Sequence, residues 1–264
     1  MAGDIDLDKT FLEIKDKFGY MKSKEVPTMT FKDEQALKET THIEVVGPSQ
    51  EGLTMGYRVP DAMSDEADLV YLVDLILANS SAGLIDLNMV KSQKCLQAYC
   101  SPSLLKERGL HYFAGSPNEG QSLEELEQLF YKQLELLKSG DFDMDLVKSI
   151  VLNKKVDNIR QFDSYQGTAY ALLDAFVMNN SWEKELAVMD KMLAYTKEDV
   201  VNFAKKYYTD GHVVVYKRKG EPQEQVKVEK PEITKVEVNR GKTSEFVTDI
   251  LTRETESITP QKLD

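Results

Sequence analysis

The stretch from Asn79 to Leu126 constrains the fold most, because it predicts a pair of strands that leads directly into a helix. Its pattern indicates a short helix over 82–90 and two strands over 94–103 and 109–115, with a charged turn between the strands. Two strands alone bury too little apolar surface to be stable in water. The rest of the chain is therefore expected to supply further strands and a covering layer of helices.

Five helices and a last strand come after this pair of strands. Ser122 and Glu125 have the spacing of a capping box, and Gly140 stands where a left-handed residue ends many helices, so we expect a helix over 122–139. Further helices are expected over 143–162, 164–178, 182–194 and 196–208, followed by a strand over 212–217.

The chain before Asn79 is expected to add two strands and two helices. The strands cover 42–46 and 53–59, and the Gly-Pro and Glu-Gly pairs that separate them indicate a hairpin turn. The helices cover 4–18 and 64–77. The first of them has an apolar stripe without an evident partner nearby, made of Leu7, Phe11, Ile14 and Phe18.

This order of elements predicts an α+β fold, with one mostly antiparallel sheet packed on one face by helices. The 264 residues suit one core domain with appendages. Residues 20–41 have the composition of an extended connector, and the polar residues 221–264, with three prolines, are expected to be an extended linker or tail.

Composition excludes some classes of partner. The formal net charge of -12 argues against nucleic acid and against anionic membranes, since both require a basic face. No window holds 18 uninterrupted apolar residues, and the N-terminus lacks the apolar core of a signal peptide. Cys95 and Cys100 lack the second pair that a zinc site would need, so we expect free thiols packed as small hydrophobes. The compartment stays open.

Three segments carry a family resemblance. Gly3-Asp4-Ile5-Asp6 opens a helix that ends Lys17-Phe18-Gly19, and Ser80-Ser81 leads into the short helix before a strand centred on Ala98-Tyr99. Thr196 to Tyr208 forms a capped helix that is followed by His-Val-Val-Val-Tyr. In this order and spacing, over residues 3–220, the segments resemble the pitrilysin/insulinase family of zinc metallopeptidases, the inverzincins.

The resemblance implies a series of homologous domains that enclose an unfolded peptide in a chamber. Residues 1–41 would be the closing helix of a preceding domain and a connector, residues 42–220 a non-catalytic domain of the peptidase family, and residues 221–264 a linker toward a second half. The chain would then be an internal part of a longer protein. Its partners would be the catalytic domain of that same chain and an unfolded peptide substrate.

The catalytic motif of that family is His-x-x-Glu-His on a helix, in which two histidines bind Zn²⁺ and the glutamate activates water. The chain has three histidines, His42, His111 and His212, and none is close enough to another to form this motif. We therefore expect no catalytic residue and no metal ligand in this chain, and zinc only in the parent protein. A zinc site assembled from the three dispersed histidines is the alternative.

The resemblance also points to one candidate substrate contact. In a later domain of the family, an arginine and a tyrosine seven residues apart contact the substrate carbonyl and stabilise the oxyanion. Tyr99 matches the tyrosine, but Ser92 stands where the arginine would be, and Lys91 is the nearest cation. Tyr99 and Lys91 are thus the candidate substrate contacts. The alternative for Tyr99 is a half-buried aromatic side chain of a strand.

Two further patterns are less specific. Glu124, Glu125 and Glu127 crowd one helix start and could act as metal carboxylates, but no histidine accompanies them in sequence, and acidic first turns are common. The loop from Gly115 to Gly120 precedes the same helix and could hold an anion. It lacks the lysine of a phosphate-binding loop, which favours an ordinary loop.

Two functions rank ahead of a third, a catalytic unit of another chemistry. The first is a non-catalytic domain of an insulinase-like zinc metallopeptidase, which forms part of the chamber around a peptide that the parent protein hydrolyses. Its sheet edge would then bind substrate as an added strand. The second is a catalytically inactive scaffold or partner subunit of the same fold family.

Overall fold

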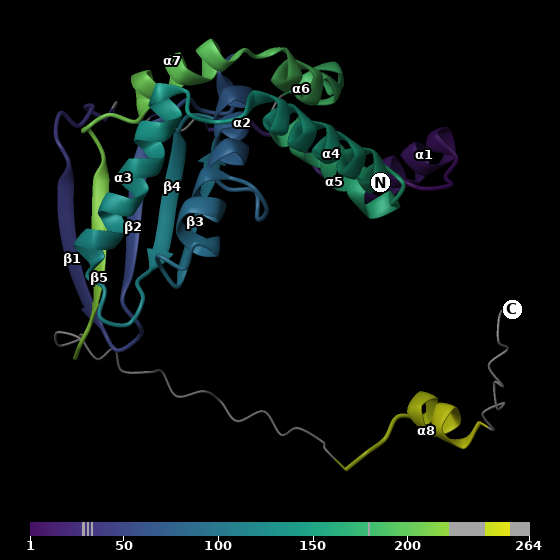
Figure 1. Cartoon of the computed structure of the whole chain (residues 1–264). Coiled ribbons are helices and arrows are strands. Elements are labelled where there is room, and N and C mark those ends of the chain that lie inside the picture. The colour runs from purple at the N-terminus through teal and green to yellow at the C-terminus, as the bar shows by residue number, and fades with distance from the viewer. Residues whose placement is uncertain (28–29, 31, 33, 179, 222–240, 254–264) are drawn as a thin grey trace, which may run out of the picture. The chain divides into compact units, whose positions relative to one another are not determined.

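The computed structural model describes residues 1–27, 30, 32, 34–178, 180–221 and 241–253, and it divides into two compact units, Met1–Gln223 and Glu224–Asp264 (Figure 1). Within these residues the strands are β1 (Thr41–Gly47), β2 (Gly52–Val59), β3 (Gln97–Leu104), β4 (Gly109–Ser116) and β5 (Val213–Lys219). The helices of the first unit are α1 (Leu7–Phe18), α2 (Ala67–Leu77), the π-helix η1 (Asp86–Lys91), α3 (Leu123–Ser139), α4 (Met144–Phe162), α5 (Tyr165–Val177), α6 (Trp182–Ala194) and α7 (Lys197–Tyr207).

The five strands form one sheet in the order β1-β5-β2-β4-β3. Only the β1–β5 pair is parallel; β5–β2, β2–β4 and β4–β3 are antiparallel. The sequence-based hairpin between the first two strands is wrong, because β5 lies between β1 and β2. Crossing one intervening strand spans roughly 10 Å, which the short connection between β1 and β2 can reach. Nothing local in the sequence signals this long-range pairing.

One face of the sheet forms the core. Alternate residues of β2, β4 and β5 point to it, and Met55, Phe113 and Val214 are fully buried there. α3, α2 and α7 pack against this face, which Figure 1 shows for α3 in front of the strands. The predicted α+β class, with a mostly antiparallel sheet and helices on one face, is confirmed.

The structure contains the helix caps that the sequence predicted for α3. The Ser122 hydroxyl accepts a hydrogen bond from the Glu125 N–H at 3.1 Å, and the Glu125 carboxylate accepts one from the Ser122 N–H at 2.9 Å. Such a cap stabilises a helix by about 1 kcal/mol. Gly140 ends α3 with a left-handed φ of 75°. Because α3 begins at a fixed point, its apolar stripe with Phe130 and Leu134 faces the sheet.

Two predicted helices differ in detail. α2 begins at Ala67 rather than at Ser64, because the Ser64 hydroxyl accepts the Glu66 N–H, at 3.2 Å, in a turn before the helix. The short helix expected over 82–90 overlaps a π-helix, η1, which covers Asp86–Lys91. Cys95 lies just before β3, and Cys100 lies within it. Both are buried free thiols, as predicted.

Several helices leave apolar side chains exposed. α1 is capped by Asp6 and buries none of its residues, and Leu7 and Phe11 are 75% and 65% exposed. Gly3, just before α1, lies close to the Tyr165 ring at the start of α5. α4 and α5 expose further apolar side chains, among them Leu152, Ile159, Leu173 and Phe176.

The second unit contains α8 (Glu245–Thr252), which Ser244 caps by accepting the Val247 N–H. The prediction of an extended tail is therefore wrong over this segment. Phe246 and Ile250 are four residues apart, which favours a helix with one apolar side. Residues 222–240 and 254–264, also part of that prediction, lie outside the described residues. Among the residues described, no helix has the length and apolar character needed to cross a bilayer.

Candidate functional site

Tyr99, a predicted substrate contact, lies on the edge strand β3 and points to the sheet face opposite the core. Its neighbours Ala98 and Cys100 are buried in the core, whereas Tyr99 is 41% exposed. Its ring meets Tyr112 of β4 edge to face, with 6.3 Å between ring centroids. This edge-to-face contact is a favourable geometry for aromatic pairs, and it leaves Tyr99 partly exposed on this face.

Lys91, the second predicted contact, is the last residue of η1. Its ammonium group donates a hydrogen bond to the Ser81 carbonyl, and its side chain is exposed. Ser92, in the position where the family has arginine, donates its hydroxyl proton to the Asn88 carbonyl at 2.6 Å. The structure thus pairs Lys91 with the 79–83 loop and Tyr99 with Tyr112, and within the described residues it shows no direct contact that joins these two candidates into one site.

The loop from Asn79 to Gly83 is organised by one carboxylate that the sequence analysis missed. Oδ2 of Asp86 accepts hydrogen bonds from the N–H groups of Asn79, Ser81 and Gly83 at 2.7, 3.2 and 3.1 Å. Asp86 is buried, so these three bonds replace the water that its charge would otherwise bind. They fix the loop to which Lys91 is tied.

His111 lies in a buried polar cluster with Asp74 of α2, Cys100 of β3 and Tyr208 at the end of α7. Oδ1 of Asp74 lies 3.1 Å from Nε2 of His111 and 3.2 Å from Sγ of Cys100, and Nδ1 of His111 lies 2.6 Å from the Tyr208 hydroxyl. Burial raises the pKa of the Cys100 thiol well above its ordinary value, and the nearby Asp74 charge adds to this. The thiol is therefore protonated unless a cation binds beside it.

The other two histidines share a second network, centred on Glu127 of α3. Nε2 of His42 lies 3.0 Å from Glu127, and the Tyr131 hydroxyl lies 2.6 Å from Glu127 and 2.8 Å from Nε2 of His212. Tyr216 also donates to the Glu127 carboxylate. Burial alone would raise the pKa of Glu127, but the hydrogen bonds from Tyr131, Tyr216 and His42 outweigh it and lower that pKa.

His42 lies beside Glu127 near the start of α3, although the two residues are 85 positions apart in the sequence. The sequence predicted no histidine near the glutamates of this helix. The pairing was invisible in the sequence because it depends on β1 lying at the edge next to α3. Glu124 instead binds Arg218 at 2.6 Å, and Glu125 serves in the capping box.

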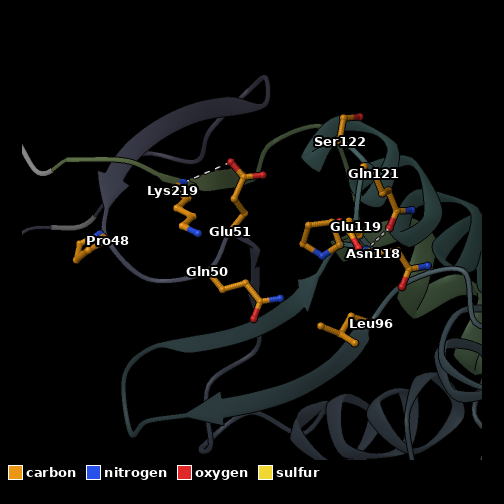
Figure 2. Close-up of a pocket in the computed structure, with 11 residues that line it drawn as sticks. Pro48, Gln50, Glu51, Leu96, Asn118, Glu119, Gln121, Ser122 and Lys219 are labelled. Carbon is orange, nitrogen blue, oxygen red and sulfur yellow. Dashed lines mark hydrogen bonds between the residues drawn. The ribbon is translucent and has the colours of Figure 1, made fainter.

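The Gly115–Gly120 loop borders an open hollow of about 920 Å³ at one end of the sheet (Figure 2). Its lining includes Glu51, Glu119 and Lys219. The Lys219 N–H donates to Glu51 at 3.3 Å, and the Glu125 N–H in the first turn of α3 is already used by the capping box. Acidic side chains and an occupied donor favour an ordinary loop over an anion site.

Comparison with known proteins identifies the family. Residues 1–153 match the family described as the Peptidase M16 inactive domain. The chain belongs to this family. The predicted relationship to pitrilysin/insulinase-type zinc metallopeptidases, as a non-catalytic domain, is therefore confirmed.

Individual relatives agree with this assignment of an M16 inactive domain. The chain is 22% identical over 215 residues to the zinc protease PqqE of Helicobacter pylori, covering 80% of this chain and 48% of PqqE. The crystal structure of a protease from Helicobacter pylori superposes with a TM-score of 0.75 at 22% identity, covering 82% of this chain and 54% of that one. The M16 inactive domain from Pseudomonas fluorescens gives a TM-score of 0.65 at 15% identity, with 85% and 54% covered. This chain thus spans about half the length of the curated relative.

The zinc site of the peptidase family does not fit the residues of this M16 inactive domain. The sequence contains no His-x-x-Glu-His. Nε2 of His42 is engaged with Glu127, Nε2 of His212 with Tyr131, and His111 lies in the other cluster. The alternative of one zinc site built from the three histidines therefore has no support in the geometry.

Proposed function

We propose that this chain is the non-catalytic half of an insulinase-like zinc metallopeptidase and that it forms part of the wall of a chamber that encloses an unfolded peptide. In this account the parent protein hydrolyses the peptide with zinc held by its catalytic half. The chain itself contributes no catalytic residue. Neither nucleic acid nor a membrane is a partner, in keeping with its net charge of -12.

The observation that carries the proposal is the accessible second face of the sheet. His42 and Glu44 of β1 point toward α3, where they meet Glu127 and the Arg218–Glu124 pair. Residues between and beside them therefore point the other way. This face carries Ile43, Val45, Leu110 and Tyr99, each between 41% and 44% exposed. These exposed apolar and aromatic side chains lie on β1, β4 and β3, and side chains of this kind suit contact with an extended peptide.

The backbone of β1 offers a second kind of contact. β1 is an edge strand that, among the described strands, pairs only with β5, so its other side presents N–H and C=O groups outside the sheet's ladder. An unfolded peptide can add there as a further strand, whose affinity comes from main-chain hydrogen bonds. Tyr99, with Lys91 as a second candidate, would contact substrate at the opposite edge of the sheet.

Exposed apolar side chains on two helices are consistent with a partner domain that covers them. Leu7 and Phe11 of α1 and Phe176 of α5 are 75%, 65% and 82% exposed. Single soluble domains rarely leave so many large apolar side chains in water unless a partner covers them. We infer that residues 1–41 close a preceding domain, that residues 42–220 form the non-catalytic domain, and that residues 221–264 link it to a second half of the parent protein. The catalytic domain of the same parent chain is then the partner.

A peptidase assay with separated parts tests this proposal. The chain alone is expected to leave a fluorogenic peptide intact, and addition of the His-x-x-Glu-His domain of its parent protein is expected to restore zinc-dependent cleavage. Tyr99→Ala is expected to weaken cleavage through KM. Tyr71→Ala is the matched control, because Tyr71 is 44% exposed but lies on α2. Stable association without any cleavage would instead favour the inactive scaffold.

A further inference from the structure

The cluster of Asp74, Cys100 and His111 has a geometry that the proposed function does not use. Its three potential ligand atoms, a carboxylate oxygen, Sγ and an imidazole nitrogen, all lie within 4.8 Å of one another. Among the described residues, this is the one group of at least three histidine, cysteine or acidic side chains whose ligand atoms lie so close together. The residues come from α2, β3 and β4, so the cluster lies where the helical layer meets the sheet.

The distances suit a tetrahedral metal ion. Zn²⁺ bonds to sulfur at about 2.3 Å and to nitrogen or oxygen at about 2.0–2.1 Å, which places neighbouring ligand atoms roughly 3.3–3.6 Å apart. The Asp74–Cys100 and Asp74–His111 separations are 3.2 and 3.1 Å. These two contacts need only a slight widening for ligation, and the ligand atoms of Cys100 and His111 lie within 4.8 Å of each other.

The chemistry of the three side chains selects among metals. A thiolate, an imidazole and a carboxylate together suit Zn²⁺, or Co²⁺ as its spectroscopic substitute, whereas Mg²⁺ and Ca²⁺ prefer sites made only of oxygen. Asp74 retains 19% exposure of its side chain, while that of His111 has none. A fourth ligand, water, can thus reach the ion from the side of Asp74.

The surroundings of His111 match those of a metal-bound histidine. Its Nδ1 lies 2.6 Å from the Tyr208 hydroxyl, a contact that leaves Nε2 facing Oδ1 of Asp74. Metal-ligating histidines regularly use their second nitrogen in this way, because the outer hydrogen bond fixes the ring and its tautomer. A divalent ion would also neutralise the carboxylate and the thiolate in this poorly hydrated place.

We propose that Asp74, Cys100 and His111 bind one Zn²⁺ ion as three protein ligands, and that this site is separate from the catalytic zinc of the parent protein. Binding forms Zn–S, Zn–N and Zn–O bonds and breaks the S–H bond of Cys100, whose proton leaves to solvent. The imidazole proton moves from Nε2 of His111 to Nδ1, where it is donated to the Tyr208 hydroxyl. No oxidation state changes. Because a proton is released, affinity rises with pH.

Cobalt binding to the full 264-residue chain tests the site. One Co²⁺ per chain is expected, with the absorption of a thiolate-to-cobalt charge transfer. Cys100→Ser should abolish this band and weaken binding more than the roughly 10–100-fold that loss of an outer-shell partner causes. Cys95→Ser is the matched control, because Cys95 is also a buried free thiol and lies outside the cluster. It should leave the band and the affinity unchanged.

Two measurements guard against variants that simply unfold. Circular dichroism should show that Cys100→Ser is folded, and Tyr208→Phe, which keeps all three ligands, should bind Co²⁺ roughly 10-fold more weakly with the band intact. Zn²⁺ should raise the Tm of the unmodified chain and of Cys95→Ser. Cobalt binding without a thiolate band, or equal binding by Cys100→Ser and Cys95→Ser, would overturn the proposal, as would an unmodified chain that binds no Co²⁺.

Discussion

Nε2 of His111 lies 3.1 Å from Oδ1 of Asp74, and this contact joins β4 to α2 inside the domain. Without a metal ion, Asp74 is the acceptor for the imidazole N–H and for the Cys100 thiol. Among the described residues, no other side chain serves both donors. Asp74 is therefore the acceptor for both groups where the helices meet the sheet, and the effect of its removal can be measured.

Replacement of Asp74 by alanine is expected to destabilise the metal-free chain by about 1–3 kcal/mol, because it leaves buried donors of His111 and Cys100 unpaired. Urea unfolding in the presence of a chelator measures the change. Asp16→Ala is the control, since Asp16 is 75% exposed on α1 and should change the free energy of unfolding by less than about 0.5 kcal/mol. Equal effects of the two variants would contradict the account.

Stability should also fall with acidity through His212. Burial lowers the pKa of His212, partly opposed by its hydrogen bond to the Thr209 carbonyl. A histidine with a lowered pKa in the folded state stabilises the fold above its unfolded pKa, about 6.5, and this contribution is lost as pH falls through the folded pKa. Glu127, Asp210, Tyr131 and Tyr57 face this ring.

The variant His212→Gln separates this effect from other titrations. As pH falls below about 6.5, the unfolding free energy of the unmodified chain should decrease, and the variant should show a shallower dependence. Glu127 does not interfere, because its lowered pKa places its own loss of stability below its ordinary value of 4.5. Urea unfolding at several pH values gives the two slopes. Identical slopes would show that His212 is not the group that titrates.

The sequence predicted well the features that depend on residues close together in the chain. It predicted poorly the contacts between residues that are far apart in the chain. The capping boxes at Ser122 and Thr196 placed α3 and α7, because a cap is a contact over three residues. The insertion of β5 between β1 and β2 was missed, since it joins residues far apart. The meeting of Asp74, Cys100 and His111 was missed for the same reason: no motif spacing links α2, β3 and β4.

Removal of the Asp86 carboxylate is expected to loosen the loop that positions Lys91. Asp86→Ala removes the acceptor of three N–H groups, and we expect a loss of about 2–3 kcal/mol in the free energy of unfolding. Hydrogen exchange at Asn79, Ser81 and Gly83 should increase. Glu119→Ala, in an exposed loop, should change neither quantity. Unaltered exchange in Asp86→Ala would contradict the assigned role.

Two glycines with similar backbone angles provide an internal comparison. Gly140 and Gly120 have φ of 75° and 79°, so alanine at either position costs about 1–2 kcal/mol for the left-handed conformation. A Cβ atom at Gly140 would also lie 3.3 Å from Val201, whereas at Gly120 it would meet nothing within 4 Å. Thermal unfolding should therefore show a larger Tm decrease for Gly140→Ala. A larger decrease for Gly120→Ala would contradict this packing of α3 against α7.

The most direct test of the central claim measures peptide cleavage by the chain alone, by the catalytic domain of its parent alone, and by the two together. We expect no cleavage by the chain at any zinc concentration and strong zinc-dependent cleavage by the mixture. Tyr99→Ala should reduce cleavage by the mixture, whereas Tyr71→Ala should not. Zinc-dependent cleavage by the chain alone, or a mixture no more active than the catalytic domain, would contradict the claim that this chain is the non-catalytic half of the peptidase.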